Sequence, residues 1–428
     1  METKTGALLD ELKARGLLAQ VSDEAGLAAH LAGGSRTVYC GFDPTADSLH
    51  IGNLVPLLTL RRFQEHGHRP ILLLGGATGL IGDPSGRNDE RSLNQTDVVA
   101  GWVERIRNQV EGLVSFSGNN AALIENNLDW TAGLDVISFL RDIGKYFSVN
   151  TMIQRESVKA RLDRDDQGIS YTEFSYMLLQ AMDYAELAER HHCSIQIGGS
   201  DQWGNIISGM DLVRRKLGQD AFALTVPLVT KADGTKFGKT AAGAIWLDPA
   251  KTSPYSFYQF WLNTADADVA HFLKIFTFLP IAEIDSLMQS FQEAPGERRA
   301  QKTLAAEVTR LLHGEQGLES ALRITDALFH GELDSMTETD LIQLQQDGMD
   351  STVIDSTSVG LLTVLADSGL APSKGQARKL VTSNGVRVNG SVVADPEAEL
   401  DFADALHERF FLLRRGKKNW HLLVRNQP

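Results

Sequence analysis

Up to about residue 230, the chain alternates between short apolar runs and longer stretches with helical spacing, and this alternation restricts the fold more than any other feature. Runs of aliphatic, β-branched and aromatic residues occupy positions 37–42, 70–75, 122–125, 193–197 and 223–229. Between them, apolar side chains recur every three or four residues, as over 97–114 and 171–189. Strands that alternate with helices predict an α/β fold, in which helices cover both faces of a parallel sheet.

Polar, glycine-containing clusters follow three of the predicted strands. They begin after Phe42, after Leu74 and after Ile197. In open parallel sheets, ligands bind beyond the carboxyl ends of the strands. The three clusters therefore predict one binding site at a single edge of the sheet.

The first cluster is typical of a strand, a turn and a helix. A proline-containing turn at 43–45 ends the strand, because proline cannot donate to a sheet ladder. We expect Ser48 to cap a helix over 49–65, with His50 and Gly52 in its first turn. A helix N-terminus attracts phosphate, and a glycine there lets a flat ligand lie on the backbone. The cluster therefore predicts a phosphate or nucleotide site.

Beyond residue 240 the strand signal disappears. Helical spacing covers positions 257–262, 271–279, 281–292, 298–313 and 317–329. Positions 331–356 hold seven Asp or Glu and no Lys or Arg, which indicates a solvated acidic linker.

The end of the chain has the pattern of a small α+β unit. Helices are expected at 361–366 and 374–382, a hairpin turn at Asn389-Gly390, and a second strand pair at 410–413 and 421–424. We therefore expect a parallel-sheet domain over 1–240 with inserted helices, an α-helical domain over 241–330, the linker over 331–356 and an α+β domain over 357–428.

Charge is distributed unevenly along the chain. The whole sequence has a formal charge of −14, which argues against a surface that binds nucleic acid everywhere. From residue 371 onward, however, 10 Lys or Arg stand against 6 Asp or Glu. The end of the chain is therefore the candidate for contact with an anionic partner.

The composition, with 43% hydrophobic and 22% charged residues, is that of a globular protein. Only two cysteines, Cys40 and Cys193, are present, so we expect no disulfide framework and no metal site. No apolar run reaches the roughly 18 residues of a membrane span, and the N-terminal helix lacks a secretory pattern. We expect a cytoplasmic protein without membrane contact.

A second chemical signal lies at 231–240, where Lys236 and Lys239 stand three residues apart in a glycine-containing loop. Both can reach one polyphosphate. A phosphate-binding P-loop would need a glycine at Asp233, but the glycine is Gly234, and such a loop would follow the first strand. We therefore reject a P-loop.

Five motifs in this order resemble the bacterial-type tyrosyl-tRNA synthetases, a branch of the class I aminoacyl-tRNA synthetases. They are Tyr39-Cys-Gly-Phe-Asp-Pro-Thr, His50-Ile-Gly-Asn53, Gly75-Gly-Ala-Thr-Gly-Leu-Ile-Gly-Asp-Pro-Ser, Gln196-Ile-Gly-Gly-Ser-Asp-Gln-Trp-Gly-Asn205 and Lys236-Phe-Gly-Lys-Thr240. The resemblance covers essentially the whole chain. It implies a Rossmann-like catalytic domain, an anticodon-side helical domain and an S4-like RNA-binding domain. It also implies a homodimer that uses L-tyrosine, tRNA(Tyr) and ATP with Mg²⁺, without a tightly bound cofactor.

The resemblance assigns one set of residues to tyrosine. Tyr39 and Asp183 would bind the phenol, and an aspartate that loses such a partner would be left buried and unpaired, which disfavours phenylalanine. Asp83, Tyr176 and Gln180 would surround the ammonium group, and Gln202 would contact the carboxylate. The tyrosine set is completed by Thr78 and Asn127.

A second set is implied for ATP and the reaction. The nucleotide contacts would be Cys40, Gly41, Asp43, Gly52, Asn53, Gly199, Asp201 and Lys239. The groups that stabilise phosphate charge would be Thr45, His50, Arg87, Arg91, Lys236, Lys239 and Thr240. One departure is Asn53, because the family motif often ends in a second histidine. An asparagine amide donates a hydrogen bond but cannot carry charge, so we expect a nucleotide contact without proton transfer.

The basic residues near the end of the chain form the third set. An RNA-backbone site is favoured over a merely charged hairpin for Lys374, Arg378, Lys379, Arg387, Arg414, Arg415, Lys417 and Lys418.

Two other functions compete with this interpretation. A tryptophanyl-tRNA synthetase would share the fold and mechanism, but the Tyr39 and Asp183 pair and the basic C-terminal unit argue against it. A catalytically inactive, synthetase-like RNA-binding protein is disfavoured because His50 and both lysines are intact.

Overall fold

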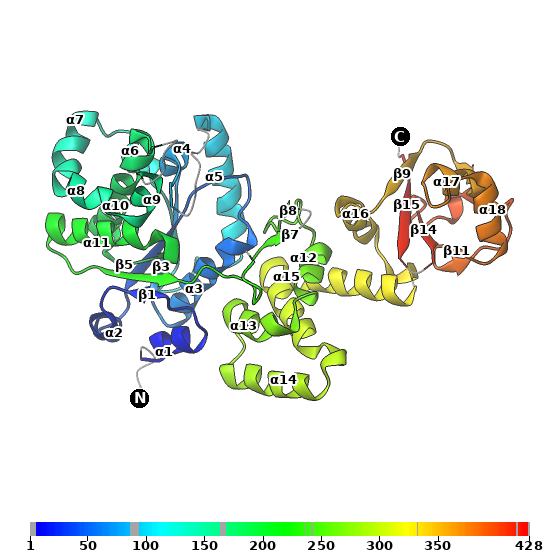
Figure 1. Cartoon of the computed structure of the whole chain (residues 1–428), viewed down its shortest axis with the longest axis horizontal. Coiled ribbons are helices and arrows are strands. Elements are labelled where there is room, and N and C mark those ends of the chain that lie inside the picture. The colour runs from blue at the N-terminus through cyan, green and yellow to red at the C-terminus, as the bar shows by residue number, and fades with distance from the viewer. Residues whose placement is uncertain are drawn as a thin grey trace. The chain divides into compact units, whose positions relative to one another are not determined.

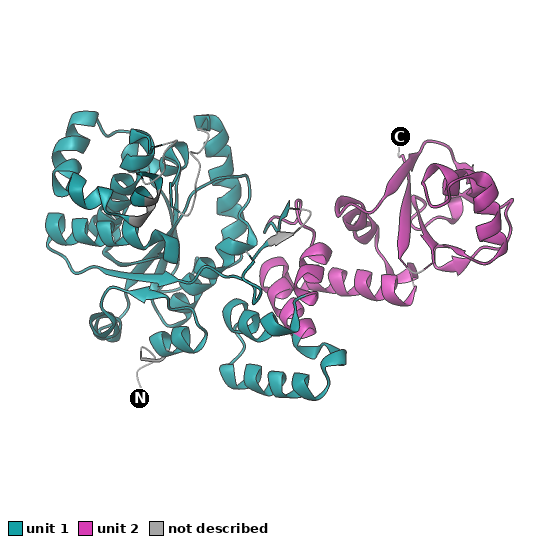
Figure 2. Cartoon of the chain, in the orientation of Figure 1, with its two compact units in different colours: residues 1–247, 264–300 teal, residues 248–263, 301–428 magenta. Residues whose placement is uncertain are grey.

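The structure is a computed structural model that describes residues 6–85, 94–162, 168–235, 237–240, 243–331, 333–416 and 418–426. The chain forms two compact units (Figure 2). One comprises residues 1–247 and 264–300, and the other comprises residues 248–263 and 301–428. Within the described ranges, no helix is both long and apolar enough to cross a membrane.

A six-stranded sheet forms the centre of the first unit (Figure 1), in the order β1–β6–β5–β2–β3–β4. The strands are β1 (Gln20–Val21), β2 (Thr37–Phe42), β3 (Arg69–Leu74), β4 (Leu123–Asn126), β5 (Cys193–Gly199) and β6 (Phe222–Val226). Strands β2 to β6 run parallel, and β1 pairs antiparallel with β6. The predicted parallel sheet is confirmed. The edge strand β1 was not predicted, because two residues carry no periodic signal.

The direction of strand addition reverses at β2. The chain passes from β2 to β3 and β4 on one side, and later to β5 and β6 on the other. Helix α3 (Leu54–Glu65) packs against β2 and β3, while α10 (Tyr171–His191) and α11 (Trp203–Leu217) pack against β5. Such a reversal opens a crevice beyond the carboxyl ends of the strands, where ligands bind in α/β sheets.

The helix after β2 begins differently from the prediction. A 3₁₀ turn, η1 (Ile51–Asn53), precedes α3, and its N-cap is His50, not Ser48. The ring of His50 accepts a hydrogen bond from the backbone N–H of Gly52, and Asn53 Oδ1 accepts one from the backbone N–H of His50. Ser48 is buried and donates to a neighbouring backbone carbonyl oxygen. His50 therefore forms the cap itself and does not lie inside the first turn.

Shorter helices complete the first unit. They are α1 (Gly6–Ala14), α2 (Glu24–Ala32), α4 (Thr78–Ile81), α5 (Thr96–Val110), α6 (Leu128–Thr131), α7 (Val136–Ser138), α8 (Val149–Ile153), α9 (Glu156–Leu162), α13 (Asp266–Phe276) and α14 (Ile281–Glu293). The helix predicted over 135–143 is α7 continued by a π-helical turn, Phe139–Ile143. The helix predicted over 149–162 divides into α8 and α9.

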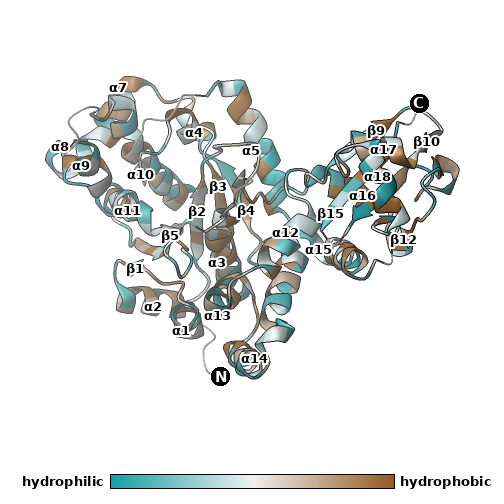
Figure 3. Cartoon of the chain, turned by 45° about the vertical axis from the view of Figure 1, so that its right-hand side comes forward, coloured by the Kyte–Doolittle hydropathy of each residue, from teal (hydrophilic) through white to brown (hydrophobic). Residues whose placement is uncertain are grey.

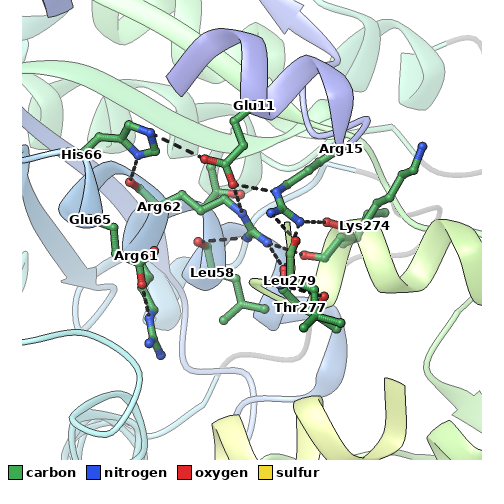
Figure 4. A network of polar contacts seen from close by, with 12 residues as sticks. Glu11, Arg15, Leu58, Arg61, Arg62, Glu65, His66, Lys274, Thr277 and Leu279 are labelled. Atoms are coloured by element: carbon green, nitrogen blue, oxygen red, sulfur yellow. Dashed lines mark hydrogen bonds and ion pairs between the residues drawn. The ribbon is translucent and has the colours of Figure 1, made fainter. Parts of the chain in front are cut away.

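A buried polar network joins α1 and α3 to the C-terminal end of α13 (Figure 4). Glu11 lies 2.6 Å from Arg15 Nε and 3.7 Å from Arg62 Nε. Burial lowers the pKa of Arg62 to about 9. The two guanidinium groups donate to the carbonyl oxygens of Leu58, Lys274, Ile275, Thr277 and Leu279. The last carbonyl oxygens of a helix lack intrahelical partners, and this network supplies them for α13.

The second unit contains α12 (Pro254–Leu262), α15 (Arg299–His330), α16 (Glu338–Gln346), α17 (Leu361–Asp367) and α18 (Lys374–Thr382). The two helices predicted over 298–313 and 317–329 belong to α15, which is interrupted at Gly314 (φ 70°, ψ −178°). That positive φ is a conformation that glycine adopts readily.

A mixed sheet in the order β12–β11–β14–β15–β9 supports the end of the second unit. Its strands are β9 (Ser351–Ile354), β11 (Val386–Val388), β12 (Ser391–Val392), β14 (Phe410–Arg415) and β15 (Asn419–Arg425). The Asn389-Gly390 hairpin is confirmed: φ is positive at both residues, 45° and 82°, as a type I′ turn requires.

The structure contradicts the expectation of a solvated linker over 331–356. The segment contains α16 and β9, and β9 pairs in parallel with β15. Leu341 and Leu344 of α16 are buried in a cluster with Phe410 and Leu422. The acidic composition was misleading because Asp340 is fully buried and accepts hydrogen bonds from Arg323 of α15 at 2.6 and 3.0 Å.

Candidate functional site

The predicted site residues gather at the carboxyl ends of β2, β3, β4 and β5. Tyr39 lies on β2, and Thr78 and Asp83 follow β3. Asn127 follows β4, and Gln202 follows β5. Helix α10 adds Tyr176, Gln180 and Asp183, which the sequence had placed on one helix face.

The deepest part of the crevice holds Tyr39 and Asp183, which are only 1% and 3% exposed. The Tyr39 hydroxyl has no hydrogen-bond partner among the described residues, and its ring packs on Tyr184 with centroids 5.2 Å apart. Burial, and then the negative charge of Asp183, raise the pKa of Tyr39 well above its usual value. An unpaired hydroxyl beside a buried carboxylate is suited to a ligand group that both donates and accepts a hydrogen bond.

Two donors hold the Asp183 carboxylate. Asn127 Nδ2 donates to Oδ2 at 3.0 Å, and Trp130 Nε1 donates to Oδ1 at 2.9 Å. Burial raises the pKa of Asp183 to about 7, although both hydrogen bonds act in the opposite direction. Trp130 was missed from the sequence. The signal was its place one turn after Asn127, on the four-residue helix α6.

Asp43 organises the next layer of the site. One carboxylate oxygen accepts from Thr78 Oγ1 at 2.6 Å, and the other accepts from the Tyr176 hydroxyl at 2.7 Å. Asn127 Nδ2 also donates to Thr78 Oγ1 at 2.9 Å, which connects Asp43 to Asp183. A Cβ at Gly75 would stand 2.0 Å from Asp43 Oδ1, so a glycine is required there. Asp43 therefore lies among the predicted tyrosine residues, although the resemblance had assigned it to the nucleotide.

Asp83 and Gln202 meet across the crevice. Gln202 Nε2 donates to Asp83 Oδ2 at 2.6 Å, and the backbone N–H of Ser85 donates to Asp83 Oδ1 at 2.9 Å. Burial raises the pKa of Asp201, the neighbour of Gln202. Gln202 is thus held in place by a carboxylate that is itself fixed by the backbone.

Negative charge surrounds the Tyr176 hydroxyl. Burial raises its pKa well above the usual value, and the charges of Asp43, Asp83 and Asp183 act in the same direction. Gln180, one turn along α10, has a buried side-chain oxygen without a hydrogen-bond partner in the described part of the chain. Carboxylates and an amide oxygen around one point form a suitable environment for an ammonium group.

The residues predicted to contact the nucleotide lie nearer the surface. Thr45, His50, Gly41 and Gly52 are exposed, and a Cβ at Gly41 would meet no atom within 4 Å. Asn53 uses its side-chain oxygen for the cap, and its amide nitrogen has no hydrogen bond to any described residue. That nitrogen can therefore still donate to a ligand, as predicted.

Cys40 and Gly199 end their strands on the same side of the sheet. Burial raises the pKa of Cys40 to about 12, so its thiol is a small packing group and not a nucleophile at neutral pH. A Cβ at Gly199 would lie 2.5 Å from Asp201 Oδ1, so the backbone there passes close to that carboxylate.

The two signature motifs lie together. The backbone N–H of Ile51 donates to the Ile245 carbonyl oxygen, and that of Leu247 donates to the Leu49 carbonyl oxygen, both at 2.9 Å. A Cβ at Gly238 would stand 2.5 Å from Ile51 Cγ2. The Lys239 and Thr240 backbone forms the short strand β7. The predicted residues Arg87, Arg91, Lys236 and Lys417 lie outside the described residues.

The predicted RNA-binding residues lie in the second unit. Lys374, Arg378, Lys379 and Arg387 are exposed, as is Lys418. Arg387 and Arg414 are opposite each other on β11 and β14, and Arg415 donates to the Leu370 carbonyl oxygen just before α18. Arg378 forms an ion pair with Glu397, which partly neutralises it. A cavity of about 640 Å³ lies in the same unit, lined by Tyr255, Phe329, Asp347, Asp350, Lys418 and Trp420, among others.

Comparison with known proteins places this fold and site in one family. The family described as tRNA synthetases class I (W and Y) matches residues 32–330, and the Tyrosine--tRNA ligase SYY-like C-terminal domain matches residues 340–423. The chain belongs to the class I tRNA synthetases (W and Y).

Relatives within this family give a narrower likeness. A Tyrosine--tRNA ligase of Klebsiella pneumoniae subsp. pneumoniae is 58% identical over 97% of both chains. A Tyrosine--tRNA ligase of Aliivibrio salmonicida is 56% identical over 99% of both. Among solved structures, a C-terminally truncated mitochondrial tyrosyl-tRNA synthetase of Aspergillus nidulans has 31% identity and a TM-score of 0.68, covering 77% of this chain and 95% of its own.

The tryptophanyl branch is more distant. A tryptophanyl-tRNA synthetase of Encephalitozoon cuniculi bound to tryptophan has a TM-score of 0.55 with 13% identity, and the match covers 74% of this chain and 92% of its own. That likeness shows a shared fold only.

Proposed function

We propose that the chain is a tyrosine–tRNA ligase. It activates L-tyrosine with ATP to tyrosyl-adenylate and pyrophosphate, and then transfers the tyrosyl group to the 3′ end of tRNA(Tyr). The observation that carries this proposal is the buried pair of Tyr39, with an unpaired hydroxyl, and Asp183, at the closed end of the crevice. The near-full-length relatives named Tyrosine--tRNA ligase support it.

The phenol of the substrate would satisfy both groups at once. Its oxygen accepts from the Tyr39 hydroxyl, and its proton is donated to Asp183. An indole N–H only donates, so tryptophan would leave one of the two groups without its best partner. Phenylalanine would leave both unpaired. Rejection of these amino acids would therefore follow from the cost of burying unpaired polar groups.

The opposite end of the amino acid would lie among the charged residues. Asp83, Gln180 and Tyr176 would bind the ammonium group, with Asp43 behind Tyr176 and Thr78. Gln202, held by Asp83, would donate to the substrate carboxylate and orient it. These assignments follow the placement of the residues around one point in the crevice.

The first reaction is an attack of the tyrosine carboxylate on the α-phosphorus of ATP. A bond forms from the carboxylate oxygen to phosphorus, the bond to the bridging oxygen breaks, and pyrophosphate leaves with the electron pair. No general base is needed, because the attacking carboxylate is already ionised. The protein would act by positioning and by stabilising the growing negative charge.

The residues of the nucleotide end would share that task. Thr45 and His50 would bind the terminal phosphate, and the exposed backbone at Gly41 and Gly52 would pass under the nucleoside. His50 accepts from the Gly52 N–H through Nδ1, which leaves Nε2 to donate to phosphate. Lys236, Lys239, Thr240, Arg87 and Arg91 would stabilise the pyrophosphate.

Magnesium would enter with the nucleotide. Within the described residues, no group of three or more His, Cys, Asp or Glu side chains is placed to hold a metal ion. Mg²⁺ commonly binds through substrate phosphates with few protein ligands. We therefore assign its coordination to ATP, where it would neutralise phosphate charge.

The second unit would bind tRNA, and the first would form a dimer interface. Five apolar side chains of the first unit are exposed on α7, the π-helical turn and α8: Val136, Ile137, Leu140, Val149 and Ile153. The hydrophobic colour of α7 at the edge of this unit is visible in Figure 3. An apolar group of this kind is typical of a protein interface. Sedimentation of Ile137→Asp should give monomers; an unchanged dimer would refute this interface. A cytoplasmic location also remains a prediction.

ATP–pyrophosphate exchange with each of the twenty amino acids tests the function. Tyrosine alone should support rapid exchange, and purified tRNA(Tyr) should then accept labelled tyrosine. Exchange with tryptophan and not tyrosine would replace the proposal by the tryptophanyl alternative. RNA binding without exchange for any amino acid would favour the inactive RNA-binding alternative.

A further inference from the structure

The loop that carries the second signature motif is attached to α13 by an aromatic contact. The ring of Phe237 packs on Phe272 with centroids 4.8 Å apart, and stacks on Phe276 at 5.1 Å with an interplanar angle of 27°. Phe272 and Phe276 are buried on one face of α13. Phe237 is itself only half-buried, so its ring reaches from the loop into this aromatic pair.

The loop is fixed on its other side by the first signature motif. Gly238 follows Phe237 with a φ of 81° and packs so closely on Ile51 that a Cβ would stand 2.5 Å from Ile51 Cγ2. The backbone N–H of Ile245 donates to the Gly238 carbonyl oxygen at 3.3 Å. Two consecutive residues are thus held from opposite sides, Phe237 by α13 and Gly238 by the turn that precedes α3.

Helix α13 is attached at both ends. Asp268, in its first turn, accepts a hydrogen bond from the backbone N–H of Ala232 at 2.6 Å, at the start of the same loop. Its last carbonyl oxygens accept from Arg15 and Arg62. Arg62 lies on α3, the helix that begins beside His50. Helix α13 therefore connects the start of the loop, Phe237 and the phosphate-site helix in one packed body.

We propose that Phe237 is a positioning residue for tyrosine activation: its ring, seated on Phe272 and Phe276, fixes the loop that brings Lys239 to the pyrophosphate. This rests on the proposed function for the role of the lysine, but the seating of the ring is independent of it. Because the lysine acts on charge that develops during the reaction, a displaced loop should lower kcat with little effect on tyrosine binding.

The test compares Phe237→Ala with Phe237→Met, which refills the apolar space, and with Phe116→Ala, a control at a phenylalanine that is 39% exposed elsewhere in the unit. For Phe237→Ala we expect kcat for pyrophosphate exchange to fall roughly tenfold to hundredfold. The KM for tyrosine and the melting temperature should stay near the original values. Phe237→Met should recover most of kcat, and Phe116→Ala should not lose it.

A second readout does not depend on activity. Trypsin can cut after the lysines of the loop, at 231, 236 and 239. Release of the ring should raise the rate of cleavage there at least about fivefold in Phe237→Ala, but not in Phe116→Ala. Unchanged kcat or unchanged cleavage in Phe237→Ala would overturn the proposal. Faster cleavage in an enzyme without tyrosine-dependent exchange would instead refute the proposed function and leave the loop anchor standing.

Discussion

At the scale of single residues, Asp183 illustrates how a binding group can oppose stability. Its carboxylate is buried, and the two donors Asn127 and Trp130 offset only part of the cost of removing its charge from water. The folded protein therefore binds a proton at Asp183 more tightly than the unfolded chain does. It follows that ionisation of this group lowers the stability of the fold as pH rises.

We predict the pH dependence that this pKa implies. The pKa of Asp183 is raised from 3.8 to about 7, so stability is lost between those values as pH rises. In Asp183→Asn that loss is absent, and the melting temperature relative to the original protein should increase from pH 5 to pH 8. The upper limit is ~4 kcal/mol, at about 1.4 kcal/mol per pKa unit. Asp129→Asn at an exposed position is the control, and a pH-independent difference would contradict the prediction.

Residue roles were predictable from the sequence where a motif carried them. Tyr39, Asp183 and Asn127 were placed correctly in one site, whereas Trp130 was not, because a lone tryptophan indicates only burial. The position of Asp43 beside Tyr176 was also hidden, since 133 residues separate them and the contact exists only after the sheet forms.

At the scale of elements, apolar runs predicted the long strands and helices well, because burial on both sides of a sheet requires them. The cap at His50 could not be predicted, since Ser48 is the more usual N-cap residue. Helix α16 was hidden because composition cannot reveal that the acidic side chain of Asp340 pairs with Arg323 from another helix. The apolar residues Leu341 and Leu344 were the signal that the acidic composition concealed.

The arginine network gives a prediction at this scale. Arg62 is 1% exposed and donates to carbonyl oxygens of α3 and of the α13 end. Arg62→Met would leave these oxygens buried without partners, which should destabilise the first unit by about 2–3 kcal/mol. Arg61→Met removes the neighbouring, more exposed guanidinium and its ion pair with Glu65, and should change stability by less than about 1 kcal/mol. Equal shifts of melting temperature in the two variants would show that the network contributes nothing specific.

At the scale of the whole molecule, the chain divides into a unit that holds the proposed activation site and a unit that holds the proposed RNA site. Because α16 and β9 pack with β14 and β15, the second unit cannot be cut cleanly at residue 357. A cut there would expose the apolar face of α16.

We predict that a chain ending at residue 331 retains tyrosine-dependent pyrophosphate exchange and loses most tRNA charging. A chain ending at residue 356 should show the same activities but aggregate more, because Leu341 and Leu344 lose Phe410 and Leu422. Both can be compared with the full chain by exchange, charging and light scattering. Full charging by the shorter chain would contradict the RNA-binding assignment.

The measurement that tests the central claim most directly is the selectivity of Tyr39→Phe. Removing only the hydroxyl should lower kcat/KM for tyrosine and narrow the ratio of tyrosine to phenylalanine activation by roughly 2- to 12-fold, as expected for one uncharged hydrogen bond. The melting temperature should stay the same or rise, because the hydroxyl is buried without a partner among the described residues. An unchanged ratio would show that Tyr39 does not bind the phenol.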